Sequence, residues 1–320
     1  MLNERRILVI GSEGQIGTEL MWAIGNRWPD CFLVGADLKQ KQSGAWVFVQ
    51  LDAMRAGELL EVVSEYRINT VFLLAALLSA TGEQAPDLAW ELNMQSLFHV
   101  LKMARDGYIR QVFWPSSIAV FGPTTPRDNA AQSTVCEPRT VYGISKYAGE
   151  LWCQWYHQKF GVDVRSVRYP GLIGYNALPG GGTTDYAVDI FHKAVRGESF
   201  TCFLAPDARL PMMFMPDAVR ATLEIMDVPA ERLSTRMAYN IGAFSFSPQE
   251  LAAAIQRHKP DFQISYAPDY RQKIAESWPA VVDDSLARAD WGWQPEYELE
   301  DMVRVMLWEL EKKQVSPSEG

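Results

Sequence analysis

The sequence predicts an α/β fold in which a doubly wound, Rossmann-type parallel sheet carries a smaller C-terminal substrate-binding lid. Three observations predict this fold. Short apolar runs alternate with helical patterns through the first half of the 320 residues, as in a series of βαβ units. A glycine-rich turn separates the first apolar run from the first helical pattern, and the alternation stops after Pro170. We therefore expect a Rossmann part at residues 1–170, a lid at 171–312 whose chain crosses back to the first part, and a frayed polar tail at 313–320.

The periodicity of apolar residues divides the first half into strands and helices. Residues 7–10 form a continuous apolar run, as a strand buried on both faces requires. Ile16, Leu20 and Ile24 then recur at helical spacing within Gln15–Arg27. The same reasoning predicts strands at 31–36, 46–51, 71–75, 111–114 and 162–169, and helices at 56–66, Pro86–Arg105 and 142–160.

In the second half, the regular alternation of strand and helix patterns stops. The run of three glycines at 180–182 predicts a flexible loop, which is followed by a short helix at 185–196 and a candidate strand at 199–203. A further helix opens near residue 247, where Ser247 is placed as N-cap, Pro248 as the first helical residue and Glu250 as the acid of a capping box.

Composition and charge exclude several classes of function. The net charge is −9 and no block of Lys or Arg stands out, so we expect no nucleic-acid or anionic-membrane partner. The longest apolar run, at 70–80, is too short to span a bilayer. The first strand leaves no room for a signal peptide, and the four cysteines form no C-x-x-C pair. These features predict a soluble, cytoplasmic protein.

The first turn has the spacing of a phosphate-binding loop. Gly11, Gly14 and Gly17 lie between the first strand and the first helix. In such a loop the first glycine permits the tight turn, the second lets the backbone approach a pyrophosphate, and the third lets the helix pack against the strand. The helix N-terminus then offers free N–H groups to the phosphates. A purely conformational turn is the alternative, but this context favours a dinucleotide site.

An acidic residue indicates which dinucleotide is bound. Asp37 ends the second strand about 20 residues after the last glycine, where a carboxylate can accept hydrogen bonds from the adenosine ribose and repel a 2′-phosphate. The nearby Lys39 and Lys41 count against this reading, yet we expect NAD rather than NADP. Asp52, after the third strand, is placed to meet the adenine edge.

A tyrosine and a lysine stand four residues apart on the predicted helix 142–160. Tyr142 and Lys146 therefore project from one face. A phenol is a poor base at neutral pH, but a neighbouring ammonium favours the phenolate and makes it a usable general base. Ser117 follows a strand and can hydrogen-bond a reacting oxygen. Taken singly, each of these features is also common on helix surfaces and in turns.

Together, the glycine turn, Ser117 and the Tyr142/Lys146 pair resemble the extended short-chain dehydrogenase/reductase family, and the resemblance covers nearly the whole chain. It implies that Tyr142 is the acid/base, that Lys146 binds the nicotinamide ribose and lowers the pKa of Tyr142, and that Ser117 steadies the substrate oxygen. It also implies a homodimer formed through the helices at Pro86–Arg105 and 142–160. The positions implied to contact NAD are Gly11, Gly14, Gln15, Ile16, Gly17, Asp37, Leu51, Asp52, Leu74, Ala75, Ala76, Asn93, Tyr142, Lys146, Tyr169, Pro170 and Leu172.

Several stretches are similar to a branch of this family that oxidises a small hydroxy amino acid. The stretches are residues 74–80, 168–173, 179–190, 210–217 and 271–279. Members that act on nucleotide sugars carry an arginine for the diphosphate where this chain has Leu210, although Arg209 stands one position away and is able to compensate.

The loop before residue 185 suits a small anionic substrate. Backbone N–H groups of the glycines, with the hydroxyls of Thr183 and Thr184, would suit a carboxylate. An ordinary N-cap after a flexible loop is the other reading. The resemblance implies that Thr183 and Thr184 contact the carboxylate or ammonium of the amino acid, that Ser79 and Trp278 line the same pocket, and that Ser117 and Tyr142 meet the substrate there.

Two other functions remain open. A nucleotide-sugar epimerase or dehydratase on the same fold would hold NAD tightly and release no net NADH. A catalytically silent NAD-sensing or scaffold protein would not need the serine, tyrosine and lysine together. We expect no metal, because the four histidines are scattered without the spacing of a zinc site.

Overall fold

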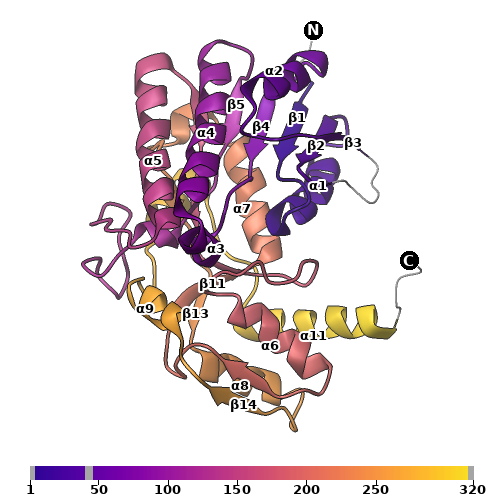
Figure 1. The fold of residues 1–320 in the computed structure, drawn as a ribbon, viewed down its shortest axis with the longest axis vertical. Helices are drawn as coiled ribbons and strands as arrows, with labels where there is room; N and C mark the ends of the chain where they lie inside the picture. The colour runs from indigo at the N-terminus through magenta and orange to yellow at the C-terminus, as the bar shows by residue number, and fades with distance from the viewer. Residues whose placement is uncertain (1–3, 40–45, 316–320) are drawn as a thin grey trace.

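A computed structural model describes residues 4–39 and 46–315. Figure 1 shows a parallel sheet with helices on both faces above a smaller lower part formed mainly by the second half of the chain. Every strand pair of the main sheet is parallel, which confirms the predicted fold class. The order across the sheet is β3 (Val47–Gln50), β2 (Phe32–Asp37), β1 (Arg6–Ile10), β4 (Thr70–Leu73), β5 (Gln111–Phe113) and β7 (Asp163–Arg165).

Successive side chains of β1 enter two separate cores, as the alternation of a strand requires. Ile7 and Val9 pack with α1 (Gln15–Arg27) and α7 (Met215–Asp227). Leu8 and Ile10 face the opposite core. The helices of that second core are α2 (Ala56–Glu65), α4 (Pro86–Arg105) and α5 (Val141–Phe160).

The strand order reverses between β1 and β4, so the helices that follow these two strands lie on opposite faces of the sheet. A crevice therefore opens beyond their carboxyl ends, which is where open α/β sheets bind ligands. The glycine-rich turn follows β1, and Leu74 follows β4. The topology thus brings these two predicted cofactor segments together.

The strand expected at 162–169 is two strands, because the chain changes sheets at Ser166. β7 pairs with β5 in the main sheet. β8 (Val167–Tyr169) pairs instead with β6 (Ser116–Ser117) and β12 (Tyr239–Asn240). Both halves are buried, so the apolar run continues through the break and the sequence pattern does not reveal the change of partner.

The segment predicted to be a lid supplies most of a third core, which residues 118–121 and Ala130 of the first half join, and it forms two small sheets. The expected helix at 185–196 and strand at 199–203 are present, with slightly shorter bounds. The capping box near residue 247 is confirmed, since Ser247 accepts from the backbone of Glu250 and Glu250 accepts from that of Ser247. The lid elements are β9 (Gly171–Ile173), α6 (Tyr186–Val195), β10 (Phe200–Cys202), β11 (Leu210–Phe214), β13 (Phe244–Phe246), α8 (Pro248–Gln256), β14 (Ile264–Tyr266), α9 (Tyr270–Glu276) and α11 (Leu299–Val315).

The last helix, which the sequence analysis does not predict, reaches into the segment expected to be a frayed tail. α11 includes residues 313–315, which the sequence placed in a frayed tail. Lys313 explains the extension, because its Nζ donates to the carbonyl of Tyr175 at 2.8 Å and to Oδ1 of Asn176 at 2.7 Å. Residues 316–320 of the predicted tail lie outside the described residues.

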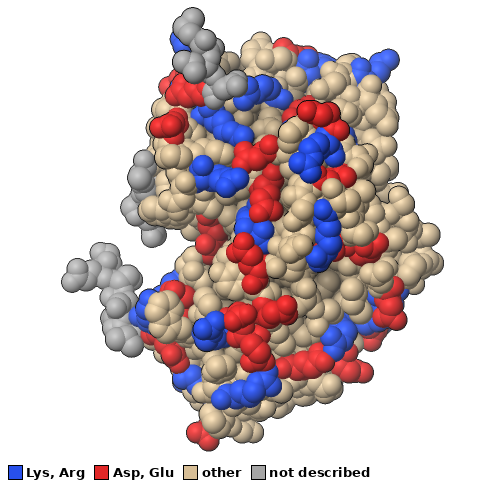
Figure 2. All heavy atoms as spheres, turned by 180° about the vertical axis from the view of Figure 1, so that it is seen from behind, with Lys and Arg blue, Asp and Glu red and all other residues tan. Residues whose placement is uncertain are grey.

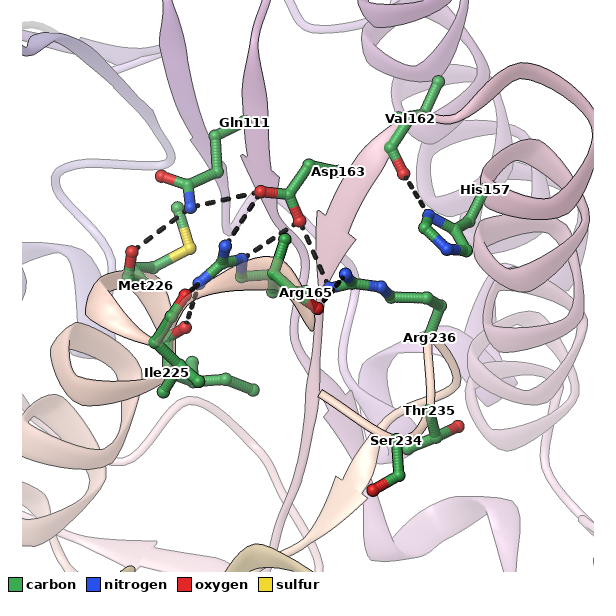
Figure 3. Close-up of polar contacts among 12 residues, drawn as sticks. Gln111, His157, Val162, Asp163, Arg165, Ile225, Met226, Ser234, Thr235 and Arg236 are labelled. Carbon is green, nitrogen blue, oxygen red and sulfur yellow. Dashed lines mark hydrogen bonds and ion pairs between the residues drawn. The ribbon is translucent and has the colours of Figure 1, made fainter. Parts of the chain in front are cut away.

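Helix α7 belongs to the second half of the chain but packs on the main sheet beside α1. Figure 3 shows Arg165 of β7 directed at the C-terminal end of α7. Its Nη1 donates to the carbonyls of Ile225 at 2.5 Å and Val228 at 2.6 Å, a favourable position for a cation at a helix C-terminus. Asp163 pairs with both Arg165 and Arg236. This cluster fastens α7 and the chain after it to the sheet.

The surface carries both charges close together. Figure 2 shows acidic and basic side chains interspersed over the face in view, without a large area of one sign. No described helix combines the length and apolar character needed to cross a membrane. Within residues 4–39 and 46–315, no three His, Cys, Asp or Glu side chains gather as metal ligands would.

Candidate active site

Two of the three glycines in the first turn are required by close packing. Gly11 has φ of +89°, and a Cβ there would lie 2.8 Å from the backbone nitrogen of Ala75. A Cβ on Gly17 would lie 2.1 Å from the carbonyl oxygen of Gly11. Gly14 is the N-cap of α1. The turn therefore holds the helix N-terminus tightly against the ends of β1 and β4.

The same turn has the features of an anion site. The first turn of α1 carries no acidic residue, so the positive end of the helix dipole is not compensated there. Gln15 and Ile16 line the cavity, and the Nε2 atom of Gln15 is buried without a hydrogen-bond partner among the described residues. An orphaned donor at a helix N-terminus fits the diphosphate of a dinucleotide.

Asp37 is held beside this turn. Its Oδ2 accepts from the backbone of Glu13 at 3.1 Å and its Oδ1 from that of Lys39 at 3.1 Å. The carboxylate therefore stands next to the glycine loop at the end of β2, where an adenosine ribose would be bound. Lys41, the other basic residue near Asp37 in sequence, lies outside the described residues.

Eight predicted cofactor residues do not line the cavity. Gly11, Gly14, Gly17 and Asp37 form or adjoin the glycine turn, and the other four are Leu51, Asp52, Ala75 and Asn93. Asp52 accepts from the backbone of Met54 at 2.9 Å, as in a turn. Leu51 is 3% exposed. Asn93 binds the backbone of Leu77 through both its oxygen, at 2.9 Å, and its nitrogen, at 3.3 Å, so it fixes the loop after β4. The fourth, Ala75, packs against Gly11.

The structure brings Ser117, Tyr142 and Lys146 to one cavity. Ser117 ends β6, and the other two begin α5. The start of α5 can lie close to the turn after β6 because Gly143 has no side chain: a Cβ there would be 2.1 Å from the carbonyl oxygen of Ala119. The Nζ atom of Lys146 is 5.5 Å from the ring centroid of Tyr142 and donates to the carbonyl of Pro115 at 2.7 Å.

Burial shifts the pKa values of Tyr142 and Lys146. It raises the pKa of Tyr142 to about 12, although a hydrogen bond with Ser117 acts in the opposite direction. Burial also lowers the pKa of Lys146 to about 7, against the attraction of Cys153 and Glu150. Both shifts disfavour the charged forms, so a positive charge brought near Tyr142 by a ligand would strongly favour its phenolate.

The four predicted substrate residues also border this cavity. Ser79, Thr183, Thr184 and Trp278 all line the same cavity as Tyr142. Ser79 begins a short helix, α3 (Ser79–Gln84), and its hydroxyl lies 3.5 Å from that of Thr183. The remaining predicted cofactor residues in this cavity are Leu74, Ala76, Tyr169, Pro170 and Leu172.

The glycine loop is not an anion site of the expected kind. The backbone N–H groups of Gly181 and Gly182 donate to Oδ2 of Asp185 at 2.8 Å and 2.7 Å. These groups are therefore already satisfied by a carboxylate of the chain itself, and only the two threonine hydroxyls remain as predicted.

Asp185 is the main residue that sequence reasoning missed. It lines the cavity and is 8% exposed, but an aspartate at the start of a helix predicts only a helix boundary. Its fold-back onto the glycine loop depends on loop geometry, which no periodicity reports. Other lining residues without a prediction are Leu78, Pro115, Ser116, Ile118 and Gly182.

Comparisons with known proteins agree with this geometry. The NAD dependent epimerase/dehydratase family model matches residues 7–242. An uncharacterised epimerase/dehydratase of Staphylococcus saprophyticus is 44% identical over 315 residues, covering 97% of this chain and 98% of that protein. The holo GalE-like L-threonine dehydrogenase of Cupriavidus necator is 56% identical, with a TM-score of 0.94 over 95% of this chain and 99% of that one.

A third relative extends the comparison to eukaryotes. The L-threonine dehydrogenase of Phytophthora infestans is 47% identical, with a TM-score of 0.93 over 96% of this chain and 99% of that one. The resemblance inferred from the motifs is therefore confirmed. The chain belongs to the NAD-dependent epimerase/dehydratase family, the extended short-chain dehydrogenases/reductases.

Proposed function

We propose that this protein is an L-threonine 3-dehydrogenase, which uses NAD to oxidise L-threonine at C3 to L-2-amino-3-oxobutanoate without a metal. One observation carries the proposal: Ser117, Tyr142 and Lys146 line the same cavity as the hydroxyls of Ser79, Thr183 and Thr184 and the carboxylate of Asp185. An alcohol to be oxidised and an amino acid to be held would meet complementary groups there. The names of the Cupriavidus and Phytophthora structures support the same substrate.

In this reaction Tyr142 takes the proton of the C3 hydroxyl while Ser117 holds the same oxygen. Lys146, in its ammonium form, favours the phenolate of Tyr142 and binds the nicotinamide ribose. Bound NAD would supply the hydride acceptor, the C4 atom of its nicotinamide ring. Gln15, Ile16 and the glycine turn would hold its diphosphate, and the other predicted contacts would position its two nucleosides.

The charged end of threonine would lie at the lid. Thr183 and Thr184 can donate hydrogen bonds to the substrate carboxylate. Asp185 uses Oδ2 for the glycine loop, so Oδ1 is placed to accept from the substrate ammonium. Ser79 and Trp278 close the pocket around the methyl group and the backbone of the amino acid.

A specific contact weakens the alternative of a nucleotide-sugar epimerase or dehydratase. Leu210 is fully buried in the lid. Arg209 donates to the carbonyl of Ser245 at 2.6 Å and forms an ion pair with Glu250, so its guanidinium is committed to the start of α8. Arg209 also does not line the cavity, which counts against its supplying the missing diphosphate contact.

The proposal includes a homodimer. Exposed apolar side chains gather on the neighbouring helices α4 and α5, among them Trp90, Trp152 and Trp155, which are 39–44% exposed. Trp155 also makes an edge contact with Trp152, with 5.5 Å between ring centroids. Several large apolar side chains exposed on two neighbouring helices are typical of a protein interface.

The product implies a second partner in function. L-2-amino-3-oxobutanoate is a β-keto acid and loses CO₂ readily unless another enzyme consumes it. A CoA-dependent ligase that cleaves it would therefore act next. This step gives the enzyme a place in threonine catabolism, and it requires no contact between the two proteins.

The test is NADH absorbance with purified protein, NAD and L-threonine, alongside L-serine and NADP as controls. NADH formation with threonine and NAD supports the proposal. Absence of NADH with every amino acid, together with NAD released on denaturation, would instead favour the nucleotide-sugar epimerase.

A further inference from the structure

A buried carboxylate that the proposed mechanism does not use lies one helical turn beyond Lys146. Glu150, on α5, is 0% exposed. Arg168 binds it with two hydrogen bonds, Nε to Oε1 at 2.9 Å and Nη2 to Oε2 at 2.7 Å. Ser116 donates its hydroxyl to the same Oε1 at 2.5 Å. Arg168 and Ser116 are also buried, at 2% and 1% exposed.

Stability alone does not account for such a group. Removing two charges from water costs free energy that their attraction often fails to recover, and replacing a buried ion pair by apolar residues is frequently neutral or stabilising. The burial of the Glu150–Arg168 ion pair is therefore weak evidence for a stabilising role, and the groups that the pair orients are the better guide to its role.

The geometry connects the pair to both segments that border the cavity. Ser116 and Arg168 are register partners in the parallel pairing of β6 with β8, as are the next residues, Ser117 and Tyr169. Glu150 thus binds two side chains that stand opposite each other on neighbouring strands. One strand presents Ser117 to the cavity and the other presents Tyr169.

Ser116 also lies between two contacts of the catalytic candidates. The residue before it, Pro115, accepts the hydrogen bond from Lys146. The residue after it, Ser117, hydrogen-bonds Tyr142. A shift of Ser116 would therefore move the partner of the lysine and the partner of the tyrosine together.

We propose that Glu150 is a positioning residue, whose buried carboxylate holds Ser116 and Arg168 and so fixes Pro115 and Ser117 against Lys146 and Tyr142. This inference rests on the proposed function, in which those groups perform the oxidation. Glu150 touches neither substrate nor cofactor and acts through its neighbours.

The charge of Glu150 supports Lys146 in a second way. The groups that face the ammonium are Tyr142, Glu150 and Cys153 on α5, with the Pro115 carbonyl and the Trp114 ring opposite. Arg168 adds a positive charge behind Glu150. Attraction by Glu150 raises the pKa of Lys146 against burial, and the hydrogen bond to Pro115 also favours the charged form. Loss of either contact should lower the pKa of Lys146.

The main variant is Ser116→Ala, which removes the link to the strand but leaves the Glu150–Arg168 pair intact. The matched control is Ser166→Ala, because Ser166 is also 1% exposed and its hydroxyl has no partner in the described part of the chain. We expect Ser116→Ala to lower kcat roughly 10- to 100-fold, as small misplacements of catalytic groups do. The KM for L-threonine, the Kd for NAD and the melting temperature should match those of the control.

A second variant, Glu150→Gln, keeps an acceptor for Ser116 but removes the charge. Its pH profile should show the descending limb of kcat at lower pH, because Lys146 loses its proton earlier. The proposal is overturned if Ser116→Ala turns over as fast as Ser166→Ala. It is also overturned if Ser116→Ala is unfolded to the same fraction by which its activity falls. Ser116→Ala decides the matter even if Glu150→Gln does not fold.

Failure of the proposed function can be distinguished from failure of this inference. If the wild-type protein oxidises no hydroxy amino acid, the inference can still be tested, because the titration of Lys146 needs no substrate. NMR of Cε-labelled lysine follows this titration, and Lys146→Met assigns the signal. A lower titration midpoint in Ser116→Ala and Glu150→Gln supports the positioning role. A midpoint unchanged in both refutes it.

Discussion

Gly17 and Gly25 lie on the same helix, α1, and the structure predicts opposite effects for the same change to alanine. A Cβ at Gly17 would lie 2.1 Å from the Gly11 oxygen and 2.8 Å from two backbone atoms of Ser12, whereas a Cβ at Gly25 would meet nothing within 4 Å. Reaching ordinary contact at Gly17 requires the backbone to move by about 1 Å, and such overpacking costs about 1–3 kcal/mol or more.

The difference in stability between the two alanine variants measures the clash at Gly17. Alanine is favoured over glycine inside a helix by about 1 kcal/mol, and this gain is common to both positions. Gly25→Ala should therefore be more stable than wild type, and Gly17→Ala less stable than Gly25→Ala by at least about 1–3 kcal/mol. Urea denaturation measures both values.

Calorimetric titration with NAD adds a second readout. Gly17→Ala should weaken NAD binding, because the phosphate-facing turn must shift, while Gly25→Ala should leave it unchanged. Equal stability and equal NAD affinity in the two variants would refute the reasoning.

Four further predictions concern the site and the interface. Tyr142→Phe should abolish NADH formation yet leave NAD affinity nearly intact; retention of most of the rate would contradict its assignment as base. Asp185→Asn should raise the KM for L-threonine about tenfold through loss of a charged hydrogen bond, and an unchanged KM would remove Asp185 from substrate recognition. Burial lowers the pKa of Lys146 to about 7 from its ordinary value of 10.5, so the unfolded chain binds more protons between these pH values and stability should rise with pH there. Lys146→Met should lack this contribution in urea denaturation across that range. Trp155→Glu should convert a dimer to a monomer in analytical ultracentrifugation, unless the apolar face of α4 and α5 is not the interface.

The first half of the fold was largely predictable because its signals are local. α1 and α4 have the predicted bounds, since each helix has its own apolar stripe and a clear start. The split of 162–169 at Ser166 was not predictable, because both strands are buried and only their hydrogen-bond partners differ.

The residues of the site also fall into those that the sequence predicts and those that it does not. Gly11, Ser117, Tyr142 and Lys146 follow from motif spacing, which reports which side chains a strand end or a helix face presents. Asp185 does not, because its contacts depend on how the adjoining glycine loop folds back on it, which no periodicity reports. Glu150 does not, because its partner Arg168 comes from a later strand.

The return of α7 to the main sheet constrains how this architecture can be recombined. The chain enters the lid after Tyr169, comes back for α7 and β12, and leaves again, so the lid is encoded in separate stretches. A chimaera made by joining two relatives at a single crossover near residue 170 would unite an Arg165 from one parent with an α7 from the other, across the contacts to Ile225 and Val228. Exchange of substrate specificity between relatives therefore calls for grafting of the intervening stretches, with α7 and β12 retained from the parent that supplies the sheet.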